Sequence, residues 1–179
     1  MNTQAEVKEL ERRIGNELRR IRRQIAAGNE SEIAIWVIPW KLACSQRPLR
    51  DHPCFGGRTP LPPEARPLVT KWVERIQREL GMRSIICLLE ERQLDRYYVR
   101  GGIELHERGL LGYYESQDLA VRHFPMTDYQ RPPESEMRKV LVAFDELPKP
   151  VLLHCSAAID RTTPVAAFIA CHRGGGSGT

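Results

Sequence analysis

The residues best placed for chemistry in this 179-residue chain are a cysteine and an arginine that five residues separate, Cys155 and Arg161. An apolar run at residues 151–154 leads into the cysteine, and the arginine opens a second apolar run at residues 162–172. This order predicts a strand, a tight loop and a helix whose first N–H groups carry about half a positive charge. A guanidinium at the helix start can hold two oxygens at once. The segment therefore predicts a cradle for an oxyanion such as phosphate, built around a thiol.

In this cradle the phosphate would be bound by the backbone N–H groups of the loop and by the guanidinium at its end. The residues concerned are Ser156, Ala157, Ala158, Ile159, Asp160 and Arg161. The two alanines have small side chains, which leaves the loop room to close tightly. We therefore expect the loop to bind phosphate mainly through its backbone.

The same arrangement would make Cys155 reactive. N–H donors, a helix start and a guanidinium lower the pKa of a thiol from about 8.5 to roughly 3.5–7.5, so the sulfur would be a nucleophile at neutral pH. Thr162 is placed to donate a hydrogen bond from its hydroxyl to that sulfur. The alternative is a buried strand cysteine beside a surface arginine, because buried filler is the usual role of a cysteine. The strand, the spacing, the threonine and the helix together favour the cradle.

The segment HCSAAIDRT resembles the signature HC-x5-R-[ST] of the cysteine-dependent protein tyrosine phosphatase superfamily. The smaller, dual-specificity-like members also have a first strand similar to IAIWVI, a strand and turn similar to SIICLLEER, and an acid loop similar to FPMTDYQRPP. These elements follow the family's order over residues 33–172. The resemblance implies an α/β fold in which helices flank a central, mostly parallel sheet.

The resemblance also implies a mechanism in two steps. Cys155 attacks phosphorus to form a phosphocysteine, Arg161 holds the equatorial oxygens, and water then hydrolyses the intermediate. Asp128 matches the family's general acid, because it lies 27 residues before the cysteine in a proline-flanked loop after a strand. Taken alone, Asp128 would be interpreted as a solvated loop carboxylate. The presence of the cradle favours the catalytic role.

Two neighbours of the cysteine and arginine qualify the resemblance. The family residue that matches His154 orients the loop and favours the thiolate by hydrogen bonding; the alternative is a buried histidine with satisfied partners. Asp160 replaces a common glycine, and its carboxylate could cap the helix or brace Arg161. The DRT sequence is also similar to phosphoinositide and bacterial broad-specificity phosphatases, although Ile159 stands where members that act on polyphosphorylated lipids carry lysine. Thr163 replaces another common glycine for no reason visible in the sequence.

Composition limits the class of protein. With 41% hydrophobic and 28% charged residues and a mean hydropathy of −0.43, the chain is expected to form one globular domain. The net charge of +4 suits an anionic substrate but is too small to indicate nucleic acid. No apolar run approaches the ~18 to 20 residues of a membrane span, and the first residues lack a secretion signal. We therefore expect no membrane span, no nucleic-acid partner and a cytoplasmic location.

The chain has five cysteines, an odd number, and their spacing does not form the close pattern of a disulfide-rich domain. We therefore expect reduced thiols. Cys87 falls on a predicted strand beside the cradle, where it would be buried filler or a partner for a reversible disulfide with Cys155. The pairs His154-Cys155 and Cys171-His172 lack the spacing of a metal site, and a metal would occupy the nucleophile. We therefore expect no metal and no other cofactor.

The elements that would position these residues alternate between strands and helices. Hydrophobic periodicity and breakers predict strands at residues 33–38, 83–89, 120–124 and 151–154, and helices at residues 6–27, 62–80, 134–147 and 162–172. The proline-rich stretch 39–63 is predicted to be surface loop, and the segments ERQLDRYY and LHERGLLGYYES are helical candidates. The alternation predicts a parallel-type sheet.

The ends of the chain form extensions to this domain. We expect an N-terminal amphipathic helix extension at residues 1–30, a phosphatase-like catalytic domain at 31–173 and a flexible Gly-rich tail at 174–179. The family's fold normally continues beyond the cradle helix, whereas this sequence stops about eight residues after it. The helices that would cover the cradle helix are therefore missing from this sequence. Either the sequence is shortened, or the N-terminal helix packs over the gap, or a partner does. The same helix could instead mediate dimerisation as a coiled coil.

These observations predict a phosphomonoester hydrolase. Its substrate would be a phosphorylated protein, with phosphotyrosine and also phosphoserine or phosphothreonine as the reacting group, or a small phosphomonoester. Two alternatives stay open. One is a phosphatase of phosphoinositides or inositol phosphates, and the other is a phosphate-binding module with little or no turnover.

Overall fold

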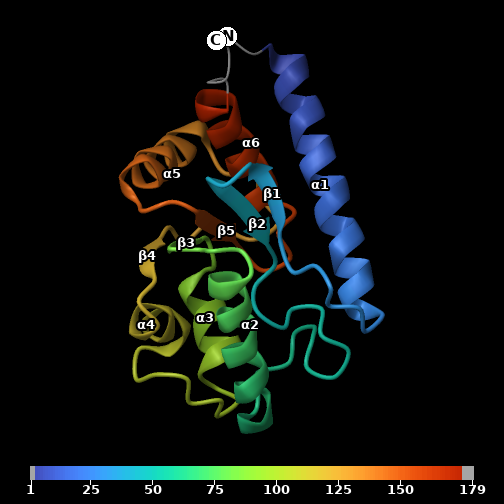
Figure 1. The fold of residues 1–179 in the computed structure, drawn as a ribbon, viewed down its shortest axis with the longest axis vertical. Coiled ribbons are helices and arrows are strands. Elements are labelled where there is room, and N and C mark those ends of the chain that lie inside the picture. Colours follow the sequence, from blue (N-terminus) through green and yellow to red (C-terminus); the bar gives the residue numbers. More distant parts are fainter. Residues whose placement is uncertain (1–2, 175–179) are drawn as a thin grey trace.

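The centre of the computed structural model, which describes residues 3–174, is a five-stranded sheet with the order β1-β2-β5-β3-β4 (Figure 1). The strands are β1 (Ile35–Ile38), β2 (Leu42–Ser45), β3 (Ser84–Cys87), β4 (Ala120–His123) and β5 (Val151–His154). Strand β1 runs antiparallel to β2, and the other three pairs are parallel. The predicted α/β fold with a mostly parallel sheet is therefore confirmed.

Strand β5 occupies the middle of the sheet. It pairs with β2 on one side and β3 on the other, so that His154 lies opposite Ser45 and Cys87. All four residues of β5 are buried, as expected for an apolar strand that is covered on both faces. Because β2, β3 and β5 run in the same direction, their carboxyl ends meet at one edge of the sheet. The chain leaves β5 at this edge, directly before Cys155.

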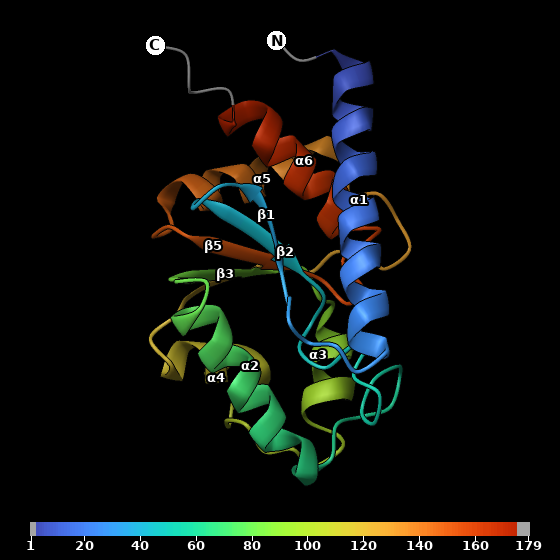
Figure 2. The same cartoon turned by 45° about the vertical axis from the view of Figure 1, so that its right-hand side comes forward.

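Helices cover both faces of the sheet (Figure 2). One layer consists of α2 (Arg66–Arg78), preceded by the short helix η1 (Pro63–Ala65), with α3 (Glu91–Tyr98) and α4 (Gly109–Ser116). The other layer consists of α1 (Gln4–Ala26), α5 (Glu134–Glu146) and α6 (Thr162–Arg173). Each layer has its own hydrophobic core against the sheet. None of the helices within residues 3–174 is both long enough and apolar enough to cross a membrane.

The N-terminal helix α1 packs along α6 (Figure 1). It starts with a capping box, in which the Thr3 hydroxyl accepts a hydrogen bond from the Glu6 backbone N–H at 3.2 Å. Its buried residues, which recur at helical spacing, are Ile14, Gly15, Leu18, Ile21 and Ile25. Of the interpretations open from the sequence, the structure matches a helix that lies on its own domain and covers α6. In the predicted Gly-rich tail, residues 175–179 lie outside the described residues.

The prediction of a surface loop over residues 39–63 is wrong for residues 42–49, because β2 and the four residues after it are buried. The strand is the short apolar run LACS, which is fully buried and pairs with both β1 and β5. The prolines at 39 and 48 flank the strand rather than interrupt it, so they remove none of its ladder hydrogen bonds. The other predicted strands and helices are present, with ends that differ by a few residues.

Candidate active site

Cys155 lies at the carboxyl end of the central strand and is 2% exposed. The preceding His154 is fully buried. Its Nδ1 donates to the Cys155 carbonyl oxygen at 3.1 Å, and its Nε2 accepts from the Tyr114 hydroxyl at 3.1 Å. Burial lowers the pKa of His154 from 6.5 to about 4, and the charges of Arg47 and Arg161 act in the same direction. The imidazole is therefore neutral at neutral pH and orients the backbone where the loop begins, without contributing a charge or a hydrogen bond to the sulfur.

Two carbonyl groups of the loop at residues 156–160 accept hydrogen bonds from the protein. The Ser156 carbonyl accepts from the Arg47 backbone N–H at 2.9 Å, and the Ala158 carbonyl accepts from the Thr163 hydroxyl at 2.9 Å. Ala158 has a left-handed backbone conformation, with φ of 68°. Within residues 3–174, none of the five backbone N–H groups of residues 156–160 donates to a protein acceptor. These N–H groups are therefore available to an anion.

Arg161 is anchored through one nitrogen and leaves the other two without hydrogen bonds. Its side chain is 1% exposed. Nη1 donates to Gln93 Oε1 at 2.7 Å, to the Met126 carbonyl at 3.2 Å and to the Leu88 carbonyl at 3.4 Å. Nε and Nη2 have no hydrogen-bond partner within residues 3–174. Because Nη1 alone makes the anchoring hydrogen bonds, the Nε–Nη2 edge can still donate to a ligand. This edge of a guanidinium can bind two oxygens of one oxyanion.

Asp128 lies beside this free edge. Its Oδ1 is 3.1 Å from Arg161 Nη2, which makes an ion pair outside hydrogen-bond geometry, and its Oδ2 accepts from Gln93 Nε2 at 2.9 Å. The Tyr129 backbone N–H also donates to Oδ1, at 3.0 Å. The side chain is 20% exposed. The structure thus brings Asp128 and the cradle arginine together, whereas a solvated loop carboxylate would contact neither Arg161 nor Gln93.

The neighbours of Arg161 make fewer contacts than the sequence predicted. The Thr162 hydroxyl is buried at the start of α6 but makes no hydrogen bond to sulfur or to any other group within residues 3–174. Asp160 is exposed; it neither caps α6 nor pairs with Arg161. Thr163, which the sequence left unexplained, holds the Ala158 carbonyl and places its methyl group against Gly15 of α1.

Two residues at the site were missed from the sequence. Gln93 links Arg161 to Asp128 through both ends of its amide. Arg47 is fully buried, stacks 3.6 Å from the centre of the Tyr97 ring and donates from Nε to the Ser156 hydroxyl at 3.3 Å. A polar residue on the buried face of a short helix was a usable signal for Gln93. An arginine in a proline-rich loop gave none for Arg47.

The cysteines on the neighbouring strands differ from Cys155 in their surroundings. Cys44 on β2 and Cys87 on β3 are fully buried, and burial raises the pKa of both thiols, to about 12 for Cys87. A thiol that stays protonated is a poor nucleophile. This environment favours buried filler for Cys87 over a redox partner.

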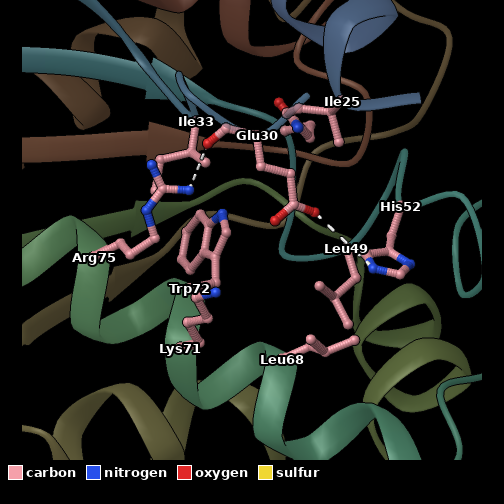
Figure 3. A pocket seen from close by; sticks show the side chains of 10 residues that line it. Ile25, Glu30, Ile33, Leu49, His52, Leu68, Lys71, Trp72 and Arg75 are labelled. Carbon is pink, nitrogen blue, oxygen red and sulfur yellow. Dashed lines mark hydrogen bonds and ion pairs between the residues drawn. The ribbon is translucent and has the colours of Figure 1, made fainter. Parts of the chain in front are cut away.

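A small cavity lies away from the cradle, between the end of α1, the residues after β2 and α2 (Figure 3). Trp72 forms one wall, the Arg75 guanidinium donates to the Glu30 carbonyl at 2.7 Å, and the Glu30 carboxylate lies 4.0 Å from His52. The volume is about 30 Å³, enough for about one water molecule. None of the cradle residues lines it. It is therefore too small and too remote to hold a substrate of the cradle.

No protein-family model matches the sequence, and no curated protein matches it significantly. Solved structures are similar in fold. The active form of Tk-PTP is 18% identical with a TM-score of 0.51, over 80% of this chain and 76% of that one. A mutant form of Tk-PTP is 20% identical with a TM-score of 0.50, over 79% and 73% of the two chains. Kinase associated phosphatase with its catalytic-site cysteine replaced by serine is 18% identical with a TM-score of 0.54, over 73% of this chain and 65% of that one.

These similarities identify the fold. The chain has the fold of the cysteine-dependent protein tyrosine phosphatases, which confirms the resemblance drawn from the sequence. At 18–20% identity the similarity shows the fold and not the activity. An argument for an activity therefore has to start from the residues at the site.

Proposed function

We propose that the chain is a phosphomonoester hydrolase that works through a phosphocysteine, with phosphotyrosine and also phosphoserine or phosphothreonine as reacting groups. One observation carries the proposal. Around Cys155, the backbone N–H groups of residues 156–160 make no hydrogen bond to a protein acceptor within residues 3–174. The same holds for Nε and Nη2 of the buried Arg161 side chain, although Nη2 is paired with Asp128. A buried donor without a hydrogen bond is costly, and a phosphate dianion would supply acceptors for all of these groups.

In the first step the Cys155 thiolate attacks phosphorus. The S–P bond forms while the bond between phosphorus and the leaving oxygen breaks, and that oxygen takes a proton from Asp128. The loop N–H groups and Arg161 hold the three remaining oxygens, on which charge is spread in the transition state. In the second step water attacks phosphorus, the S–P bond breaks, and Asp128 accepts a proton from the water. The products are the alcohol or phenol and inorganic phosphate.

The ion pair between Asp128 and Arg161 gives substrate binding a second effect. Phosphate oxygens and the Asp128 carboxylate compete for the same guanidinium edge, since Oδ1 lies 3.1 Å from Nη2. A bound phosphate would take over this edge and release the carboxyl group to face the leaving oxygen. Gln93 contacts both residues and would keep the carboxyl group near the cradle.

The aromatic side chains beside Asp128 support phosphotyrosine as one substrate. Tyr97 and Tyr129 line the cavity that contains Asp128, and Tyr129 is 72% exposed. The exposed ring of Tyr129 offers a face against which a phenyl group can stack. The leaving oxygen of a phosphotyrosine would then lie near the Asp128 carboxyl group.

Phosphate release from a panel of substrates tests the proposal. The panel contains p-nitrophenyl phosphate, peptides with phosphotyrosine, phosphoserine or phosphothreonine, and inositol phosphates. We expect turnover by the wild type, none above background by Cys155→Ser, and a fall of roughly 10²- to 10⁴-fold in kcat for phosphoserine peptides in Asp128→Asn. The fall should be smaller for p-nitrophenyl phosphate, whose leaving group needs little protonation.

Cys171→Ser is the matched control, because Cys171 lies in the last turn of α6 and touches none of the cradle residues described above. It should retain wild-type rates. Release of phosphate by Cys155→Ser at the wild-type rate would refute the mechanism. Turnover of inositol phosphates alone would transfer the assignment to the alternative substrate class, and binding of phosphopeptides without turnover would leave only a phosphate-binding module.

A further inference from the structure

A cavity of about 190 Å³ next to the cradle is lined by three arginines. Arg58 comes from the segment between β2 and η1, and Arg92 and Arg96 come from α3. The other lining residues are Gln93, Tyr97, Asp128 and Tyr129. Gln93 and Asp128 are also the side chains that contact Arg161. The cavity and the cradle therefore share a wall.

The arginines of this cavity are only partly neutralised by the protein. Arg92 forms an ion pair with Glu90 at 3.0 Å. Arg58 donates to the Tyr129 hydroxyl at 2.9 Å and contacts no carboxylate within residues 3–174. Arg96 is exposed, and its side chain makes no hydrogen bond and no ion pair with any of the described residues, 3–174.

The lining contains one carboxylate, and this group does not neutralise Arg58 or Arg96. It belongs to Asp128, whose ion-pair partner is Arg161. A surplus of guanidinium groups in a concave site attracts anions and can bind their oxygens in pairs. Since a water molecule takes about 30 Å³ of the liquid, the cavity has room for a phosphate or carboxylate and the atoms that carry it.

We propose that this cavity is a second anion subsite, so that the substrate carries another phosphate or carboxylate close to the phosphate that is cleaved. The inference rests on the proposed phosphatase function and narrows its substrate class. Arg58 and Arg96 bind the second anion, and Arg92 keeps its pair with Glu90. The Tyr129 hydroxyl, which holds Arg58, orients that guanidinium over the cavity.

Two matched pairs of substrates test the subsite. One pair is a phosphotyrosine peptide with glutamates on both sides and the same peptide with glutamines; the other is inositol 1,4-bisphosphate and inositol 1-phosphate. Because exposed ion pairs contribute modestly, we expect the wild type to prefer the more acidic member of at least one pair by roughly threefold to tenfold in kcat/KM. The pair that shows the preference identifies the source of the anion. The preference should shrink in 0.5 M salt.

The double variant Arg58→Gln/Arg96→Gln should bring this preference close to one. The double variant Arg23→Gln/Arg78→Gln is the matched control, since it removes two exposed arginines that line no cavity with the cradle residues and lack ion pairs within residues 3–174. It should keep the wild-type preference. Equal losses in the two double variants, or no preference in the wild type for either pair, would overturn the subsite.

Binding separates failure of the subsite from failure of the proposed function. Fluorescence anisotropy with the labelled glutamate and glutamine peptides can be measured on Cys155→Ser, which cannot form a phosphocysteine. Tighter binding of the glutamate peptide that disappears in Cys155→Ser/Arg58→Gln/Arg96→Gln would support the subsite even if the wild type released no phosphate. Turnover of p-nitrophenyl phosphate with no such difference in binding would overturn the subsite and leave the phosphatase function standing.

Discussion

The two ends of the central strands differ in how their buried polar groups are partnered. At the amino end, the Ser84 hydroxyl donates to the Pro148 carbonyl at 2.7 Å, and the Val151 N–H donates to the Lys41 carbonyl at 2.9 Å. At the carboxyl end, six buried side-chain atoms have no hydrogen-bond partner within residues 3–174. They are Ser45 Oγ, Gln46 Oε1, Arg47 Nη1, Arg161 Nε and Nη2, and Thr162 Oγ1.

This difference indicates that the amino end of the sheet contributes to stability, whereas the carboxyl end is suited to binding a ligand. A buried donor or acceptor without a partner costs about 1–3 kcal/mol, so a cluster of them lowers the stability of the folded chain. The amino end avoids this cost by pairing its groups within the protein. At the carboxyl end, all of the six atoms except Gln46 Oε1 can donate a hydrogen bond, and an anion-binding site needs such donors without protein partners.

The strongest test of the comparison exchanges an arginine at each end for lysine. In Arg161→Lys we expect kcat/KM for p-nitrophenyl phosphate to fall roughly 10²- to 10³-fold, because lysine keeps the charge but cannot offer two parallel N–H groups. In Arg83→Lys, next to the amino end of β3, the rate should not change, since that side chain is exposed. Phosphate release measured on both variants decides the matter. Similar rates in the two would remove the distinction between the ends.

His154 sharpens the comparison because it is a buried polar side chain at the carboxyl end with partners on both nitrogens. Its pKa is about 4 in the folded chain and near 6.5 in the unfolded chain. Between these values the unfolded chain takes up a proton that the folded chain does not. The free energy of unfolding should therefore fall as pH falls from 6.5 to 4, by roughly 3 kcal/mol from this residue, and the contribution is fully present above pH 6.5.

Urea unfolding across this pH range measures the effect. In His154→Gln the decrease in stability between pH 6.5 and 4 should be smaller than in the wild type by about the contribution of one proton. The variant is expected to be less stable than the wild type at pH 7. The two proteins are therefore compared only by how steeply the free energy of unfolding changes with pH. An unchanged slope would show that His154 titrates as it does in the unfolded chain.

The smallest expected effect comes from deleting one hydroxyl at each end. Ser84→Ala removes a buried hydrogen bond and should lower the free energy of unfolding by about 1 kcal/mol without changing kcat. Thr162→Val removes a buried hydroxyl that has no partner, so its unfolding free energy should stay the same or rise. Its kcat should fall only slightly, since the hydroxyl makes no hydrogen bond to the Cys155 sulfur within residues 3–174. Opposite results, with stability lost at Thr162 and rate lost at Ser84, would contradict the comparison.

The order of elements and the core of the site were predictable from the sequence because both depend on local patterns. Alternating apolar runs specify the strands and helices, and the HCSAAIDRT segment places Cys155 and Arg161 in one loop. Asp128 was predictable only through the resemblance to a family. In the structure it contacts Arg161 across 33 positions of sequence, a separation that no local pattern encodes.

The parts that could not be predicted depend on packing between distant segments. β2 is four residues long, and its burial results from pairing with β1 and β5. Arg47 is buried because it stacks on Tyr97 and bonds to Ser156, whereas arginines are mostly exposed. Gln93 gains its contacts only when α3 is placed beside the cradle.

The packing of α1 on α6 has a consequence for truncation. Two buried side chains of α1, Ile14 and Leu18, belong to the same hydrophobic cluster as those of α6, so α1 shields part of α6 from solvent. A polypeptide that begins after α1 would expose this apolar surface. Exposed apolar surface of this kind promotes aggregation, so such a truncation should reduce the yield of soluble protein.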